Sequence, residues 1–213
     1  MIYAENILLC IAIPMLLSLL FVRGGAQRFV ASFLVGMIAC LLAAYISGFL
    51  NLVSGMGAED TSVFISPIVE EIIKLLPLLF CLYMFQPKDE SITMIAVAIG
   101  AGFATFENCC YILSSGVETL RYVLIRGMAV GVMHIVSILA LALGLVLARR
   151  FRALSFPGIV GALSLSMTFH ALYNLLVSEP GVTAWIGYVL PVLTALILYL
   201  PYRRLRRSEE PHQ

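Results

Sequence analysis

The sequence predicts an all-α, polytopic integral membrane protein with about seven transmembrane helices, and three observations lead to this fold class. First, 62% of the 213 residues are hydrophobic and only 12% are charged, whereas soluble domains carry roughly 25% charged residues. Second, the apolar residues form seven long stretches separated by short polar breaks. Third, no low-complexity linker or internal repeat divides the chain, so we expect one transmembrane domain over residues 1–213.

Each of the seven stretches is long enough to cross a membrane, because a spanning helix needs about 20 mostly apolar residues. In order, they cover residues 5–22, 29–54, 62–85, 91–115, 121–148, 156–178 and 182–201. Arginine, glycine, proline, serine or acidic residues mark the breaks, at residues 23–25, 57–60, 87–90, 114–118, 149–152 and 179–181. No basic segment precedes the first stretch and no small-residue cleavage pattern precedes Arg23, so we expect a retained helix rather than a signal peptide.

The positions of lysine and arginine predict which side of the membrane each break faces. Ten basic residues follow the first, third, fifth and seventh stretches: Arg23, Arg28, Lys88, Arg149, Arg150, Arg152, Arg203, Arg204, Arg206 and Arg207. The alternate breaks hold only Arg121. Because cytoplasmic loops carry an excess of basic residues, we expect the N-terminus outside, the C-terminus in the cytoplasm and an odd number of spans.

Polar and ionisable residues lie inside four of the predicted spans, where a charge costs roughly 2.5–3.5 kcal/mol on insertion scales. The set comprises Glu70, Glu71 and Lys74 in the third span, Glu107 and Asn108 in the fourth, Arg126 and His134 in the fifth, and His170 and Asn174 in the sixth. Such residues normally face the bundle interior, pair with one another and mark function. Gly100 and Gly102 precede Glu107 and would let a neighbouring helix approach closely.

Depth and helical phase predict that these residues converge on one site. Four of them lie about eight residues from the outer end of their helix, roughly 12 Å at 1.5 Å per residue: Glu70, Glu71, Glu107 and His170. Lys74 stands four residues after Glu70 and three after Glu71, so it can pair with either. His170 and Asn174 are four residues apart and share a helix face. We therefore expect one polar layer in the outer half of the membrane.

The residue types in this layer suit the activation of water for hydrolysis. The charges comprise three carboxylates and two fixed cations: Glu70, Glu71, Glu107, Lys74 and Arg126. One carboxyl therefore lacks a full partner, and Glu70 or Glu71 is the expected base that takes a proton from water before hydroxide attacks a carbonyl. His170 and Asn174 form the expected pair of donors for the oxyanion. Arg126 and Asn108 are expected to be supporting groups.

Zinc is the alternative that this set leaves open, because two glutamates and two histidines can bind it and leave a position for water. The ligands would be Glu70, Glu107, His134 and His170. The chain has no HExxH motif, and its two intramembrane histidines lie on different helices, so we expect a metal-free site without a cofactor. GxSxG is also absent, and Asp60 and Asp89 fall in predicted loops, which disfavours serine and aspartic protease chemistry.

Four segments resemble the motifs of the PrsW family of intramembrane proteases. The run EEIIK from Glu70 to Lys74 resembles the family's EExxK motif, and GFATFEN at residues 102–108 resembles its GFAxxEN segment. His134 and the run HALYN that begins at His170 resemble its two histidine motifs. Order, spacing and transmembrane placement agree over about residues 60–178, which we take as the catalytic core.

The resemblance implies a glutamic-type intramembrane endopeptidase, similar to the CAAX prenyl endopeptidases in a superfamily also linked to bacteriocin processing and immunity. It implies that Glu70 is the water-activating base, that Glu71 supports it, and that His170 and Asn174 form the oxyanion site. Glu107 and His134 are the other catalytic candidates, and we expect Lys74, Arg126 and Asn108 to support the site. Superfamily members often carry His where Glu107 stands, and some relatives carry Asp in place of Asn174.

The same resemblance suggests the partners of the protein. Bacterial PrsW cleaves a membrane-anchored anti-sigma factor on its extracytoplasmic side, so we expect a membrane-anchored protein or peptide substrate, the lipid bilayer of a bacterial plasma membrane, and no nucleic acid. Two other functions stay open. The carboxylates also suit a proton- or ion-coupled transporter, and a non-catalytic binding or immunity protein could use the same scaffold. The oligomeric state is not predicted.

Overall fold

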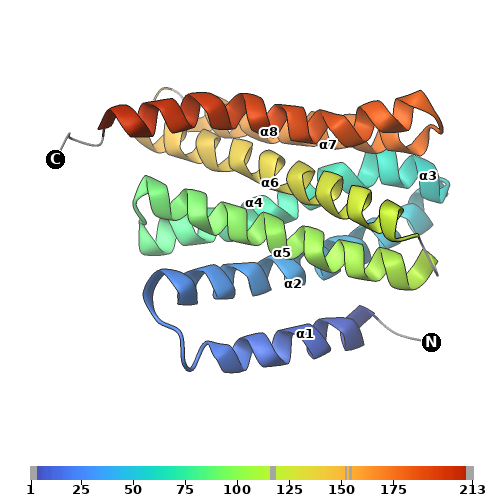
Figure 1. Cartoon of the computed structure of the whole chain (residues 1–213), viewed down its shortest axis with the longest axis horizontal. Coiled ribbons are helices and arrows are strands. Elements are labelled where there is room, and N and C mark those ends of the chain that lie inside the picture. Colours follow the sequence, from blue (N-terminus) through green and yellow to red (C-terminus); the bar gives the residue numbers. More distant parts are fainter. Residues whose placement is uncertain (1–3, 116–118, 152, 154, 210–213) are drawn as a thin grey trace.

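The computed structural model describes residues 4–115, 119–151, 153 and 155–209, and these residues fold into helices without a strand. The long helices are α1 (Ala4–Ser18), α2 (Gly24–Ser54), α4 (Ser66–Phe85), α5 (Asp89–Ser115), α6 (Leu120–Arg150), α7 (Ser155–Ser178) and α8 (Val182–Glu209). Two short elements, α3 (Ala58–Asp60) and the π-helix η1 (Thr61–Ile65), lead into α4. The long helices run alternately up and down side by side, with α1 at one edge (Figure 1). The all-α class is confirmed.

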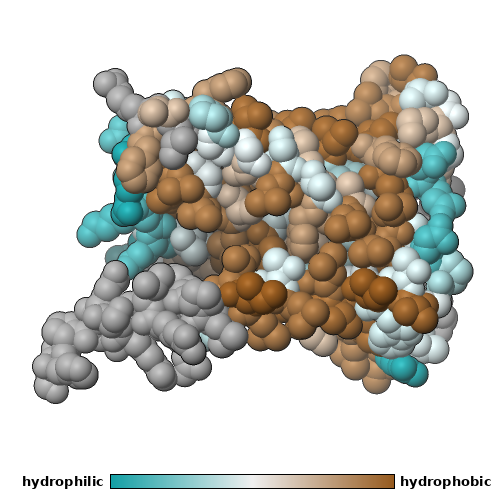
Figure 2. All heavy atoms as spheres, turned by 90° about the horizontal axis from the view of Figure 1, so that it is seen from above, coloured by the Kyte–Doolittle hydropathy of each residue, from teal (hydrophilic) through white to brown (hydrophobic). Residues whose placement is uncertain are grey.

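Five of the described helices are long and apolar enough to cross a membrane by length and composition. These are α2, α5, α6, α7 and α8, the last over Val182–Tyr199. Helix α1 has only 15 residues, and α4 carries three charged residues within its 20. Figure 2 shows a broad hydrophobic band with hydrophilic residues at both ends of the molecule. The protein is thus a multi-pass membrane protein, while the count of seven spans and the orientation stay predictions.

Helix α5 packs between α2 and α6, and glycines make the approach close. A Cβ at Gly102 would clash with the carbonyl oxygen of Phe33 in α2, and one at Gly100 would lie 2.9 Å from the side chain of Ile138 in α6. The close approach expected at these two glycines is therefore confirmed. It holds α5 against both neighbours in the turns that precede Glu107.

Three apolar clusters make up the core of the described structure, and the polar residues lie beside one of them. Helices α4, α5 and α6 contribute the buried members of this cluster: Leu75, Leu78, Ile92, Ile95, Ala96, Ile99, Ile138, Leu141, Ala142 and Leu145. Lys74, immediately before this core in α4, is completely buried, as are Glu71 and His134. The bundle thus excludes water from one side of the polar layer.

The start of α4 differs from the single helix predicted over residues 62–85. Residues Thr61–Ile65 form a π-helix, in which the backbone N–H of Ser66 donates to the carbonyl of Thr61 five residues earlier. In the same register the carbonyl of Ser62 would accept from residue 67, but Pro67 has no N–H. The Ser62 carbonyl is therefore left for another donor. Hydropathy does not distinguish this register from an α-helix, because the order of apolar and polar residues in the sequence is the same for both.

Candidate active site

Helix α4 places two glutamates and a lysine on different sides of one turn. Glu71 and Lys74 face the bundle interior and are completely buried, and the Lys74 Nζ lies 2.5 Å from the Glu71 Oε1. Glu70 keeps 16% of its side chain exposed. Of the two pairings that the sequence allowed for Lys74, the structure contains the one with Glu71.

The Lys74 ammonium has three protons and three acceptors. Besides Glu71, it lies 3.0 Å from the His134 Nδ1 and 3.3 Å from the Ser137 Oγ, both on α6. The ring of Phe103 on α5 covers it, with the Nζ 5.0 Å from the ring centroid. This buried cation is fully satisfied, and it ties α4 to α5 and α6.

The contact with Lys74 also determines the tautomer of His134. Its Nδ1 accepts from the ammonium, so its Nε2 carries the hydrogen and donates to the Glu107 Oε2 at 2.5 Å. The other oxygen of Glu107 accepts from the Arg126 Nη2 at 3.3 Å. Arg126 in turn stacks on Tyr111, with 3.5 Å between the guanidinium carbon and the ring centroid. A chain of contacts thus runs from α4 through α6 to the end of α5.

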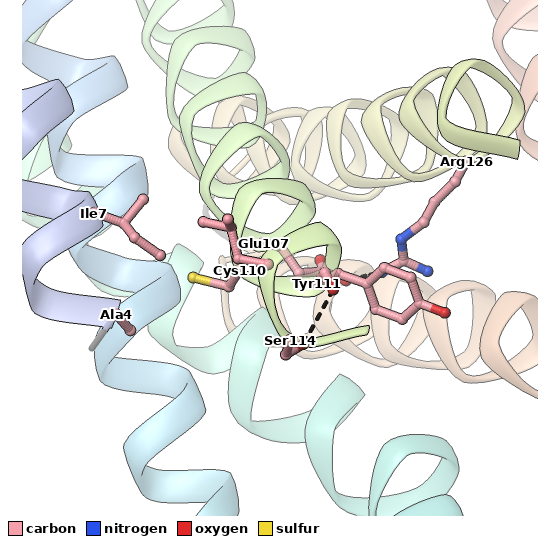
Figure 3. A pocket seen from close by; sticks show the side chains of 8 residues that line it. Ala4, Ile7, Glu107, Cys110, Tyr111, Ser114 and Arg126 are labelled. Carbon is pink, nitrogen blue, oxygen red and sulfur yellow. Dashed lines mark hydrogen bonds and ion pairs between the residues drawn. The ribbon is translucent and has the colours of Figure 1, made fainter. Parts of the chain in front are cut away.

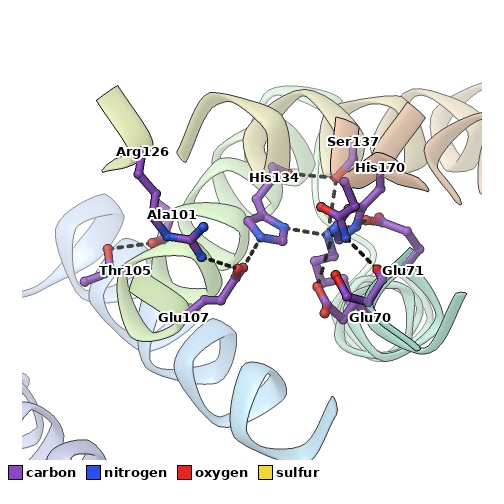
Figure 4. Close-up of polar contacts among 12 residues, drawn as sticks. Glu70, Glu71, Ala101, Thr105, Glu107, Arg126, His134, Ser137 and His170 are labelled. Atoms are coloured by element: carbon purple, nitrogen blue, oxygen red, sulfur yellow. Dashed lines mark hydrogen bonds and ion pairs between the residues drawn. The ribbon is translucent and has the colours of Figure 1, made fainter. Parts of the chain in front are cut away.

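His170 on α7 closes the network from the opposite side. Its Nδ1 lies 2.8 Å from the Glu71 Oε1, and its Nε2 lies 3.8 Å from the Glu70 Oε2. That oxygen of Glu70 is buried and has no hydrogen-bond partner within the described part of the chain. The rings of His134 and His170 meet edge to face with centroids 5.1 Å apart. Figure 4 shows these side chains of α4, α6 and α7, together with Glu107 of α5, turned toward one another.

Most of the predicted site residues meet in this network: Glu70, Glu71, Lys74, Glu107, Arg126, His134 and His170. Asn174 lies on α7 one turn beyond His170, but its Nδ2 donates to the Ser62 carbonyl of η1 at 2.9 Å. The Asn108 Oδ1 is buried without a hydrogen-bond partner in the described structure. The catalytic roles assigned from the sequence stay predictions for all of them.

Sequence reasoning missed two polar residues of this region. Ser137 binds Lys74, and it stands three residues after His134, so the helical phase that grouped His170 with Asn174 would also have found it. Tyr173, between His170 and Asn174, is 2% exposed, and its hydroxyl has no hydrogen-bond partner in the described structure. An aromatic residue in an apolar helix is normally interpreted as part of the core, so the sequence does not indicate that the Tyr173 hydroxyl is buried.

One carboxylate and two imidazoles of the network form a possible metal site. Glu70, His134 and His170 each offer a ligand atom within 4.8 Å of the other two. This donor set fits zinc, which binds two histidines and a glutamate in some catalytic sites. Glu71 contacts the far nitrogen of His170, as is usual behind a histidine ligand. Glu107 is absent from this group of three and binds His134 instead, so the predicted four-residue set is reduced to three.

A cavity of about 390 Å³ borders the network at the end of α5. Residues of α1, α5 and α6 line it: Ala4, Ile7, Glu107, Cys110, Tyr111, Leu113, Ser114 and Arg126. Glu107 and Arg126 belong to both the cavity and the network, so the two are continuous. Figure 3 shows α1 on one side of this cavity and α5 on the other.

Apolar helices around a buried network of carboxylates and imidazoles define a multi-pass membrane protein with an ionisable site in its interior. The sequence of the chain matches the family model described as PrsW family intramembrane metalloprotease over residues 25–200. The chain therefore belongs to the PrsW family of intramembrane proteases, as its motifs predicted. No curated protein and no solved structure matches it. The family description names a metalloprotease, which goes against the expected metal-free site and favours a metal-dependent one.

Proposed function

We propose that the protein is an endopeptidase that hydrolyses a membrane-anchored protein substrate within the bilayer, with Glu70 as the base that activates water. The observation that carries this proposal is the position of the Glu70 Oε2, which is buried, lacks a partner in the described structure and lies 3.8 Å from the His170 Nε2. Family membership supports peptide-bond hydrolysis. The proposed substrate is a single-span protein such as an anti-sigma factor of the bacterial plasma membrane.

The distance between Glu70 and His170 supports a role in binding water. At 3.8 Å the two atoms are too far apart for a direct hydrogen bond, which needs about 2.7–3.2 Å, whereas a water bridges groups at such separations. A water there donates one proton to Glu70 and leaves hydroxide to attack the substrate carbonyl. The protonated Glu70 then gives that proton to the departing amine.

The residues next to Glu70 and His170 orient these two side chains for binding and activating water. Lys74 neutralises Glu71, and the Glu71 Oε1 accepts from the His170 Nδ1, which leaves the His170 Nε2 facing Glu70. For the oxyanion role, His170 first takes up a proton from solvent at Nε2, and this Nε2–H then donates to the oxyanion. Asn174 has a second N–H besides the one given to Ser62, so it stays a proposed second donor.

A metal-dependent version of the same activity is the second candidate, and the three-residue donor set favours it. A divalent ion held by Glu70, His134 and His170 would supply a Lewis acid that polarises water and the substrate carbonyl. Glu70 would then be a ligand rather than the base. The His134 Nδ1 already lies 3.0 Å from the Lys74 ammonium. If the metal bound that nitrogen, the ammonium would lose this contact and retain only those with Glu71 and Ser137.

Glu70→Gln tests the proposal, because it keeps the shape of the side chain and removes the base. We expect cleavage of single-span membrane proteins in proteoliposomes to fall by about 10²–10⁴-fold, the usual contribution of a general base. Glu90→Gln is the matched control, since Glu90 is exposed at the start of α5, away from the site. Wild-type cleavage by the Glu70 variant would contradict the assignment.

Two further arms separate the alternatives. Prolonged chelation followed by zinc addition distinguishes the metal-free site, in which activity survives, from the metal-dependent one, in which zinc restores it. Proton or ion flux through the same liposomes without any cleavage would favour a transporter. Binding of candidate proteins with neither flux nor cleavage would favour a non-catalytic protein.

A further inference from the structure

The cavity beside the network has one wall that differs from the others. Helix α1 supplies Ala4 and Ile7, whereas α5 and α6 supply the remaining lining residues. Helix α1 packs against α2 and α5, and Ala12 is its only buried residue among those described. The family match begins at residue 25, after α1. Helix α1 is therefore a peripheral wall, which packs on one apolar cluster of the core and takes no part in the packing of α5 against α6.

The chemistry of the cavity suits an extended polypeptide. Its α1 side is aliphatic, while Glu107 and Arg126 bring charged groups to the opposite side. The Arg126 Nε is buried and has no hydrogen-bond partner in the described structure, although its Nη2 binds Glu107. An extended peptide carries unpaired carbonyl and N–H groups, and it needs such donors and acceptors once it leaves water. A lipid acyl chain has no group that would satisfy Arg126.

The position of the cavity relates it to the reacting groups. Glu107 lines it and also binds His134 at 2.5 Å, and the ring of His134 contacts that of His170. A chain seated in the cavity therefore lies next to the network that contains Glu70. The volume of about 390 Å³ lies within the usual range of roughly 300–1,000 Å³ for binding pockets.

We propose that this cavity receives the extended juxtamembrane segment of a single-span substrate, and that the segment enters laterally from the bilayer as α1 moves away from α5. This inference rests on the proposed proteolytic function. A membrane-anchored chain reaches the site from within the bilayer, so it needs a side entrance. Helix α1 is the wall that is able to move without breaking the packing of α5 between α2 and α6.

A reversible tether between α1 and α5 tests the moving wall. Ile7 and the native Cys110 both line the cavity, and Figure 3 shows them facing each other across it. A bifunctional methanethiosulfonate is added to the Ile7→Cys variant, which then holds α1 to α5. We expect cleavage of an anchored substrate to fall at least tenfold on tethering and to return on reduction. The matched control carries both Ile7→Cys and Cys110→Ser, and each variant is compared with itself before and after the reagent.

A short water-soluble peptide with the same scissile sequence separates the two proposals. We expect the tethered protein to retain more of its activity on this peptide than on the anchored substrate, because the peptide does not need the lateral route. If the untethered protein cleaves neither substrate, the proposed function fails. If a quantitative tether leaves cleavage of the anchored substrate unchanged, the lateral entrance is wrong while the protease assignment stands.

Photo-crosslinking adds a readout that does not depend on turnover. A photoreactive amino acid replaces Leu113 in the cavity or, as a control, exposed Leu196 on α8, both in the Glu70→Gln background. We expect the anchored substrate to crosslink at position 113 and not at position 196. Crosslinks to lipid alone at position 113 would overturn the inference.

Discussion

Lys74 shows how a single buried residue holds together groups from several helices. Its ammonium contacts Glu71 within α4 and two groups of α6, and its side chain is completely inaccessible to water. A buried charge is tolerated when it is paired and all of its protons are hydrogen-bonded. Each of the three acceptors would lose one donor if the ammonium were removed, although the Glu71 Oε1 would keep the His170 Nδ1. The residue thus has a structural role in addition to its electrostatic effect on Glu71.

Lys74→Met is expected to destabilise the protein even though it preserves volume. It leaves Glu71 as a buried carboxylate without its cation, and breaking a buried ion pair costs about 3–5 kcal/mol. The measurement is the melting temperature in detergent, with Lys88→Met at an exposed lysine as the control. Adding Glu71→Gln should recover part of the loss, because it removes the uncompensated charge. An unchanged melting temperature for Lys74→Met would contradict the pairing.

The sequence predicts which residues belong to the site better than it predicts which of them contact one another. A charge in an apolar helix is visible because it costs free energy in lipid, so Glu70, Glu71 and Lys74 stand out. Their spacing allows Lys74 to pair with either glutamate. Which one it meets depends on the rotation of α4 in the bundle, and the packing against α6 and α7 sets that rotation. The free oxygen of Glu70 is therefore a property of the tertiary structure.

At the scale of elements, η1 and α7 depend on each other through one hydrogen bond. The π register of η1 directs the Ser62 carbonyl toward position 67, where proline has no N–H to offer. Asn174 of α7 supplies the donor instead, at 2.9 Å. A missing backbone donor is thus replaced by a side chain from a helix more than 100 residues later in the chain. This contact fixes α7 against the segment that leads into α4.

Asn174→Ala and Pro67→Ala should therefore be non-additive. Asn174→Ala alone removes the donor to Ser62, and we expect a loss of about 1 kcal/mol in stability, typical of one hydrogen bond. Pro67→Ala provides a backbone N–H to the same carbonyl, so Asn174→Ala should cost less in that background. Melting temperatures of the two single variants and the double variant give the coupling. Strict additivity would show that the carbonyl does not depend on Asn174.

Helix positions follow from the apolar stretches, whereas the π-helix does not. Each predicted stretch overlaps one long helix, because a helix that crosses the bilayer needs a long run of apolar residues, and such a run is visible in the sequence. The change to a π-helix at residues 61–65 leaves no such pattern in the sequence, since it alters backbone hydrogen bonds without changing which residues are apolar. The close contact of α5 with α2 and α6 was predictable only because Gly100 and Gly102 are conspicuous in an apolar helix.

At the scale of the whole molecule, the question is whether α4, which carries part of the polar site, crosses the membrane. Helix α4 has 20 residues, enough to cross a membrane, but the three charged residues Glu70, Glu71 and Lys74 set it apart from the five apolar helices. Glu71 and Lys74 point into the bundle, so lipid does not meet them. The lipid-facing side of α4 is instead apolar, with exposed Ile68, Ile72 and Leu76. These observations favour α4 as a span alongside the five apolar helices, and α1 would complete the predicted seven.

Orientation of the whole chain is the remaining prediction, and the basic residues provide it. We expect the N-terminus outside and the C-terminus in the cytoplasm, because ten lysines and arginines fall on one set of loops and one on the other. Fusions to a phosphatase that is active only outside the cytoplasm, and to a fluorescent protein that is active only inside, measure this directly. Fusions after residues 57 and 180 should report the outside, and those after residues 87 and 213 the cytoplasm. Termini on the same side would contradict an odd number of spans.

The termini alone do not distinguish seven spans from five, because both numbers are odd. The pair of fusions after residues 57 and 87 isolates α4, which lies between them. Opposite sides for this pair mean that α4 crosses the membrane, and the same side means that it does not. A fusion before α1 and another after residue 23 show in the same way whether α1 crosses the membrane. If α4 did not cross, Glu70 and His170 would not lie in a layer within the bilayer, and cleavage of an intramembrane or juxtamembrane segment by this site would lose its structural basis.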